Sequence, residues 1–325
     1  LSAFVHSALQ LYVLRFLLGA AEAGFFPGVI IYLTYWFRAK DQATSVALFT
    51  AAIPVSYLLG APLSTWIMDH AGWRAMLMLE GIPALLGGVA CYLFLTDTPE
   101  RAKWLTPDEK QWLSAELAKD RVERPEVKTL TTWQAIAAPK VLALALIYFI
   151  YQAGSLGVGY WMPQIIASLS GHVTNFQIGL LAMLPYAIAT VAMIVWSAHS
   201  DRTGERQRHA ALPLLAAAIA LATTGLTRNP AASLTLISIA LAGLYAFKAP
   251  FWSLPGLFLS RSTAAISIAS INSIGNLGGF VGPYLVGVAK GSSGDPLSGL
   301  LFLAGLLLLS FFLTQFGRFA PRGVN

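Results

Sequence analysis

Charged residues are scarce in this sequence. Asp, Glu, Lys and Arg make up 11% of the 325 residues, whereas 56% of the residues are hydrophobic. A soluble domain carries about a quarter charged residues, so the composition excludes an ordinary soluble enzyme. The few charges are also unevenly spread, because 16 of the 36 lie between positions 97 and 140. The sequence therefore predicts an all-α membrane protein with one polar insert.

Cysteine and catalytic patterns are equally sparse. Cys91 is the only cysteine, so an internal disulfide is impossible. The five histidines lack the spacing of metal ligands, and the sequence has neither a Ser-His-Asp pattern nor a phosphate-binding glycine loop. We therefore expect no enzyme activity, no catalytic residue, no metal, no cofactor and no nucleic-acid partner, although the net charge is +6. The histidines are His6, His70, His172, His199 and His209.

Long apolar runs make up most of the remaining sequence. Because a hydrocarbon core of ~30 Å needs about 20 apolar residues per helix, the sequence predicts nine membrane-spanning helices. The prolines and glycines within them predict kinked and closely packed helices. The predicted spans cover residues 9–36, 43–67, 74–96, 141–167, 176–198, 209–227, 232–259, 263–289 and 296–317.

Lysine and arginine predict how these spans are oriented. If the loop at 37–42 is cytoplasmic, sixteen cations lie on its side of the membrane and only Arg74, Arg228 and Lys290 lie on the other. Positive residues stay on the cytoplasmic side, so the C-terminus is predicted to be cytoplasmic.

The polar insert separates three predicted spans from six. Its segment Thr106-Pro107-Asp108-Glu109 is typical of a helix start, with a capping Thr, a Pro in the first turn and a capping-box Glu. We expect residues 97–140 to form a cytoplasmic linker with a short amphipathic helix. Residues 141–325 would then form a C-terminal six-helix transmembrane domain.

A weak internal repeat extends this prediction. Gly60-Ala61-Pro62 and Val281-Gly282-Pro283 coincide at their prolines when the halves are shifted by 221 positions. Such duplication is typical of secondary transporters. Residues 1–96 would then be helices 4–6, with the end of helix 3, of an N-terminally truncated protein that has twelve helices in two pseudo-repeated six-helix domains.

The loop at residues 197–206 reads SAHSDRTGER. It resembles the signature loop of the major facilitator superfamily, from which Ser197 and Glu205 depart. The resemblance implies the major facilitator fold and a gating loop, because carboxylate and guanidinium groups can bridge helix ends in one state and separate in another. A charged turn that only obeys the positive-inside rule is the other interpretation. The predicted gating residues are Asp201, Arg202, Gly204 and Arg206.

Four further groups of residues follow one another through the chain. They are LYVLRFLLGAAEAGFFPG at 11–28, GWR at 72–74 with EGIP at 80–83, WMPQ at 161–164, and FWSLP at 251–255 with NSIGNLGGF at 272–280. Together they are similar to the anion:cation symporter family, the branch with tartrate, phthalate, hydroxyphenylacetate and sugar-acid permeases. The resemblance implies an organic-anion transporter of a bacterial inner membrane.

Arg15 and Glu22 are the first candidate site residues. With Tyr12 they line one stripe of the predicted helix, about 10 Å apart along its axis, and an ionisable group inside a span normally faces a cavity or a partner. Arg15 stays charged and suits an anion, whereas Glu22 can carry a proton; the resemblance also implies proton coupling by this Glu. In the other interpretation Arg15 reaches the outer interface and Glu22 only ties helices together.

Other polar residues within the spans are candidates for substrate binding. Lys248 is a second anion contact, or it packs near the cytoplasmic end of its span, or it pairs with another buried acid. For the others, helix packing is the alternative to substrate contact. They are Trp252, Asn272 and Asn276, which match family positions that face the central cavity, and Tyr148, Tyr151 and Gln152, which form a polar stripe.

These observations predict a monomeric secondary transporter in the lipid bilayer. It would couple the entry of a small organic anion, such as a sugar acid, tartrate or an aromatic acid, to protons by alternating access. One alternative is a facilitator or exporter without proton coupling. Another is a transporter-like membrane sensor that signals through the linker.

Overall fold

The computed structural model describes most of the chain. The described residues are 2–122, 131–170, 174–224, 226–227, 229–259, 261–293, 296–317 and 319. Every regular element within them is helical, which confirms the predicted all-α class. The sequence predictions that concern residues 123–130, His172, Arg228 and residues 320–325 lie outside the described residues.

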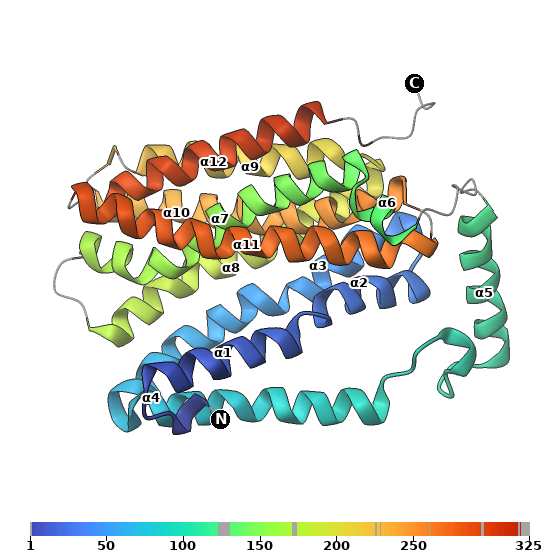
Figure 1. Ribbon diagram of the computed structural model, residues 1–325, viewed down its shortest axis with the longest axis horizontal. Coiled ribbons are helices and arrows are strands. Elements are labelled where there is room, and N and C mark those ends of the chain that lie inside the picture. The colour runs from blue at the N-terminus through green and yellow to red at the C-terminus, as the bar shows by residue number, and fades with distance from the viewer. Residues whose placement is uncertain are drawn as a thin grey trace.

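The helices form two groups joined by a linker. Figure 1 places α1–α4, the N-terminal unit, along one side of α7–α12, the C-terminal unit, with α5 beside the ends of the helices. The N-terminal unit consists of α1 (Ala8–Glu22), α2 (Phe25–Trp36), α3 (Gln42–Thr50) and α4 (Ala52–Phe94). The linker holds α5 (Pro107–Val122) and α6 (Thr132–Ile136). The C-terminal unit consists of α7 (Pro139–Ser170), α8 (Asn175–Thr203), α9 (Gln207–Thr224), α10 (Pro230–Ser253), α11 (Arg261–Ser293) and α12 (Pro296–Phe316).

Among the described residues, seven helical segments are long and apolar enough to cross a membrane. The nine predicted spans differ from these seven for two reasons. The spans predicted at 43–67 and 74–96 run together as Gln42–Phe94, although Gly72, with φ 80° and ψ 169°, interrupts the helical backbone between them. The span predicted at 209–227 is α9 (Gln207–Thr224), which begins with a polar turn. This helix is therefore not among the seven apolar segments.

Two predicted spans are broken near prolines. The span predicted at 9–36 is divided into α1 and α2 at Ala23 and Gly24. Pro27 lies four residues after Ala23 and has no N–H to donate to the carbonyl of Ala23. The same effect separates α3 from α4, because Pro54 cannot donate to the carbonyl of Thr50. Ala23, Gly24 and Ala51 keep right-handed helical backbone angles, so each segment still continues as one apolar span.

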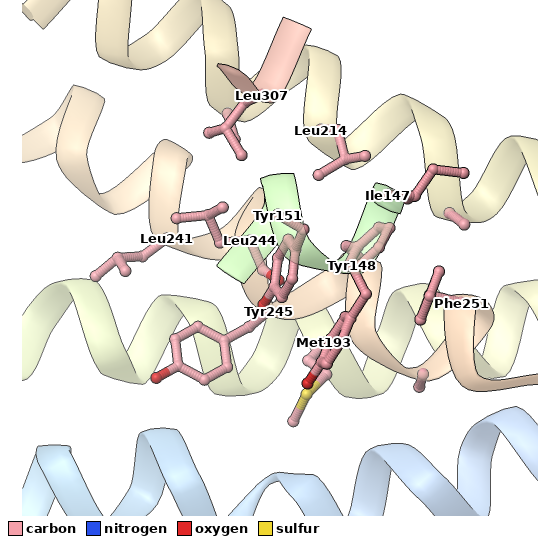
Figure 2. Close-up of a cluster of buried hydrophobic side chains, with 14 of the residues drawn as sticks. Ile147, Tyr148, Tyr151, Met193, Leu214, Leu241, Leu244, Tyr245, Phe251 and Leu307 are labelled. Carbon is pink, nitrogen blue, oxygen red and sulfur yellow. The ribbon is translucent and has the colours of Figure 1, made fainter. Parts of the chain in front are cut away.

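Burial differs between the two units. The hydrophobic core lies mainly in the C-terminal unit, where helices α7–α12 surround it, as Figure 2 shows for part of the cluster. In contrast, α1 has no buried residue, and Tyr92 in the second half of α4 is 89% exposed. Apolar faces of this kind are interaction surfaces for lipid or protein.

Helices α7 and α11 approach each other closely through glycines. A Cβ atom added to Gly278 or to Gly282 would lie 1.9 Å from a backbone carbonyl oxygen of α7, that of Phe149 or of Ala153. Backbone atoms cannot move aside as a side chain can, so these positions require glycine. This contact holds the two helices that carry five of the predicted site residues, Tyr148, Tyr151, Gln152, Asn272 and Asn276.

We therefore expect Gly282→Ala to destabilise the protein. Overpacking of this kind costs about 1–3 kcal/mol, which a lower thermal unfolding temperature in detergent would register. Gly305→Ala in α12 is the matched control, because a Cβ there meets nothing within 4 Å. Equal unfolding temperatures for the two variants would contradict the close approach of α7 and α11.

Candidate functional site

An aromatic cluster joins α7 to α10 in the middle of the C-terminal unit (Figure 2). The hydroxyl of Tyr151 donates a hydrogen bond of 2.8 Å to the carbonyl of Leu244 in α10, and its ring lies 4.3 Å from that of Phe247. Tyr148 meets the edge of Trp252 at 4.9 Å. Tyr151 thus has a packing role in this structure, since its proton is already donated to the protein.

The indole N–H of Trp252 differs from the hydroxyl of Tyr151 in its hydrogen bonding, although both side chains are buried. Its indole Nε1 makes no hydrogen bond to any residue that the structure describes. Its ring also meets Phe26 of α2 edge-on, with 5.1 Å between the centroids, and so contacts the N-terminal unit. A buried donor without a partner is costly. The N–H has no accessible surface in this conformation, so a ligand would pair with it only after the junction of the two units opens.

Of the two amide side chains of α11, one is hydrogen-bonded to α7 and the other makes no such bond to a described residue. Gln152 of α7 donates a hydrogen bond of 2.8 Å to the side-chain oxygen of Asn276, so these two residues hold α7 against α11. Asn272, one turn earlier, is 6% exposed, and its side chain makes no hydrogen bond within the described part of the chain. Asn272 is therefore the amide of α11 that remains open to a ligand.

The predicted residues of the first span lie on α1 and do not join this cluster. Tyr12, Arg15 and Glu22 are all exposed, and neither Arg15 nor Glu22 forms an ion pair with any described residue. Glu22 is the last residue of α1, four residues before Phe26. Contact between this span and the aromatic cluster therefore runs through Phe26, which the sequence analysis did not single out.

The loop after α8 links the two units. Asp201 accepts hydrogen bonds from the backbone N–H groups of Ala43, at 3.2 Å, and Thr44, at 2.6 Å, at the start of α3. It also forms an ion pair with Arg206, whose guanidinium donates to the carbonyl of Lys40 at 3.3 Å. A carboxylate at a helix N-terminus receives orphan N–H groups and a favourable dipole. We call this set of interactions the α3–α8 contact.

The other two predicted gating residues have different positions. Gly204 ends α8 in the left-handed conformation, with φ 69°, which explains the glycine at this position. Arg202 is exposed. Of the four predicted gating residues, Asp201 and Arg206 are therefore the two with described hydrogen bonds to the N-terminal unit.

Glu205, where the loop departs from the family pattern, organises the start of α9. Its carboxylate accepts hydrogen bonds from the backbone N–H groups of Arg208 and His209 and lies 3.1 Å from Nδ1 of His209. Nε2 of His209 in turn lies 2.7 Å from Nδ1 of His199. The ten-residue separation of these two histidines does not reveal that α8 and α9 turn back on each other, so their contact cannot be predicted from the sequence.

The linker helix α5 is attached to the N-terminal unit. Arg38, two residues after the end of α2, forms ion pairs with Asp41 at 2.9 Å and with Glu116 of α5 at 3.3 Å. Hydrogen bonds from Lys119 and then from Arg38 lower the pKa of Glu116. Thr106 and Glu109 form the predicted capping box at the start of α5.

Comparisons with known proteins agree on one family. The family model described as the Major Facilitator Superfamily matches residues 1–283. A protein of Agrobacterium vitis named "Putative tartrate transporter" is 44% identical over all of this chain and 73% of its own length. A "Quinolone resistance transporter" of Acinetobacter baumannii is 33% identical over 96% of this chain and 73% of its own length.

A solved structure shares the fold. The proton:xylose symporter XylE bound to 6-bromo-6-deoxy-D-glucose matches with a TM-score of 0.58 and 16% sequence identity over 87% of this chain. The chain spans 65% of the length of that symporter.

The sequence relatives, the shared fold and the apolar helices all indicate the same type of protein. They describe an integral membrane transporter of a small molecule rather than an enzyme, and the relatives point to a bacterial protein. The chain belongs to the major facilitator superfamily.

Proposed function

We propose that the protein is a proton-coupled importer of a small organic anion. The observation that carries this proposal is the presence of Arg15 and Glu22 seven residues apart in Ala8–Trp36, a segment apolar enough to cross a membrane. Neither has an ion-pair partner among the described residues. Charges at such a position are expensive and are normally retained for function.

The chemistry of the two groups differs in a way that suits symport. A guanidinium does not release its proton at working pH, so Arg15 offers a permanent cation to a carboxylate. A carboxylate can exist in both protonation states, so Glu22 can take up a proton on one side of the membrane and release it on the other. The relative named as a tartrate transporter supports an organic acid as the substrate.

Alternating access would use the two units. In the proposed organisation, residues 1–96 belong to the N-terminal domain, residues 97–140 form the cytoplasmic linker, and residues 141–325 form the C-terminal six-helix domain. Asp201 and Arg206 close the α3–α8 contact on the predicted cytoplasmic side. Inward opening would require this contact to break, since it joins one unit to the other.

Counterflow in liposomes that contain the complete protein tests this function. Labelled tartrate should enter tartrate-loaded liposomes, and an inward proton gradient should drive accumulation in empty ones. Counterflow without any effect of the proton gradient would instead indicate a facilitator or an exporter, which the relative named as a quinolone resistance transporter favours. Binding without flux would indicate a sensor.

Asn272 is expected to read hydroxyl groups on the substrate. Its buried amide lacks a protein partner among the described residues, so Asn272→Ala should leave a substrate hydroxyl unpaired and cost about 1–3 kcal/mol of binding. Tartrate should lose affinity by that amount in competition assays, whereas succinate, which lacks both hydroxyls, should lose much less.

The exposed neighbour Ser273 provides the control, since Ser273→Ala should change neither affinity. An equal loss for tartrate and succinate in Asn272→Ala would mean that Asn272 holds α11 in place rather than the ligand.

A further inference from the structure

Lys248 lies on the face of α10 that is directed at the N-terminal unit. One turn before it, Tyr245 packs edge-on against Tyr186 of α8, with ring centroids 6.3 Å apart, and Tyr186 stacks at 4.7 Å on Tyr57 of α4. One turn after it, Trp252 meets Phe26 of α2. Residues at spacings of three and four share a helix face. Lys248 therefore lies on the same face of α10 as Tyr245 and Trp252, whose aromatic contacts connect α10 to the N-terminal unit.

The protein provides little stabilisation for the positive charge of the Lys248 ammonium group. Its Nζ lies 5.3 Å from the centre of the Tyr245 ring, an interaction worth about 0.5–2 kcal/mol. No ion pair of Lys248 occurs in the part of the chain that the structure describes. Because α10 belongs to a segment apolar enough to cross a membrane, a cation there should have an anionic partner.

The helices around Lys248 offer no carboxylate for this purpose. The sequence of α7–α12 contains one acidic residue within its helices, Asp201. Asp201 is already engaged by Arg206 and by the start of α3. Glu205, the other described carboxylate of the C-terminal unit, lies in the loop after α8 and is engaged by His209. A counter-ion for Lys248 must therefore come from outside the described residues of this unit.

We propose that Lys248 binds a second carboxylate of the substrate and makes the protein selective for dicarboxylates. This inference rests on the proposed function, in which Arg15 binds the first carboxylate. One fixed cation neutralises a monocarboxylate, whereas a dicarboxylate needs a second cation, which Lys248 on α10 would supply. The free Nε1–H of Trp252, one turn from Lys248, and the amide of Asn272 suit the hydroxyl groups of a body such as that of tartrate.

Tartrate and threonate form the discriminating pair of ligands. Threonate is tartrate with one carboxylate replaced by a hydroxymethyl group, so the two differ in the group that Lys248 would bind. Their dissociation constants are measured by calorimetry on the purified complete protein, and counterflow is measured separately in liposomes. Lys248→Gln should raise the dissociation constant of tartrate at least tenfold and that of threonate less than twofold.

Two further variants separate charge from packing. Lys248→Arg keeps the cation and should bind tartrate within about threefold of the unchanged protein, even if Lys248→Gln folds poorly. Lys140→Gln is the matched control, because Lys140 also lies over an aromatic ring, that of Phe258 at 5.0 Å, but at the start of α7. It should change neither dissociation constant.

The outcomes distinguish this inference from the proposed function. Equal changes for both ligands, or no change for tartrate, in Lys248→Gln would overturn the role of Lys248. Tartrate binding that depends on Lys248 but occurs without flux would support Lys248 and overturn transport. Failure of the unchanged protein to bind either ligand would overturn both.

Discussion

Glu22→Gln is expected to abolish proton-driven accumulation of the substrate while preserving exchange. An amide resembles the protonated carboxyl group and cannot release a proton, so the variant should still carry substrate in both directions but should lose the coupling. Accumulation driven by a pH gradient should fall to the level of empty liposomes. Counterflow of labelled tartrate should continue at a rate similar to that of the unchanged protein.

Glu80 supplies the matched control for this experiment. It is another carboxylate within an apolar segment, but it accepts a hydrogen bond from Ser64 in the same helix, α4. Glu80→Gln should therefore leave gradient-driven accumulation intact. Accumulation at the normal rate in Glu22→Gln would remove Glu22 from the coupling mechanism.

Asp201→Asn is expected to shift the conformational equilibrium without changing selectivity. The substitution weakens charge-assisted hydrogen bonds to Ala43, Thr44 and Arg206, and bonds of this kind are worth about 1.5–3 kcal/mol. The state that contains the α3–α8 contact should therefore lose roughly 10- to 150-fold in population. Dissociation constants for tartrate and threonate should keep their ratio, because Asp201 lies near the end of α8 and binds Ala43, Thr44 and Arg206 rather than a residue of the aromatic cluster.

Cysteine labelling measures this shift. Ala47 in α3 is fully buried, so a cysteine placed there, with Cys91 replaced by Ser, should react faster with a thiol reagent in the Asp201→Asn background. Arg202→Gln is the control, because Arg202 belongs to the same loop but is exposed. A changed ligand preference with unchanged labelling would contradict a gating role for Asp201.

Much of the fold follows from apolar length and proline chemistry. The polar linker, the capped start of α5 and the spans of the C-terminal unit are local features, because each depends on residues close together in the sequence. The break at Gly24 is harder to predict from the sequence, since it depends on how the folded helix accommodates the missing N–H of Pro27. Gly72 was also ambiguous, because glycine in an apolar run is compatible with either a turn or close packing.

The candidate site was less predictable because its contacts join distant segments. Sequence spacing places Gln152 and Asn276 on polar helix faces, but only the folded chain pairs them with each other and leaves Asn272 open. The role of Asp201 at the start of α3 likewise joins positions about 160 residues apart in the sequence. Phe26 and the pair His199 and His209 carried no signal, since aromatic residues and single histidines are common in such helices.

The central claim, that protons enter with an organic anion, is tested most directly by the pH inside liposomes. The complete protein is reconstituted with a pH-sensitive dye in the lumen, the membrane potential is clamped to zero, and tartrate is added outside at equal pH on both sides. We expect the lumen to acidify as labelled tartrate enters and Glu22→Gln to remove the acidification. Entry of labelled tartrate at an unchanged lumenal pH would contradict proton coupling.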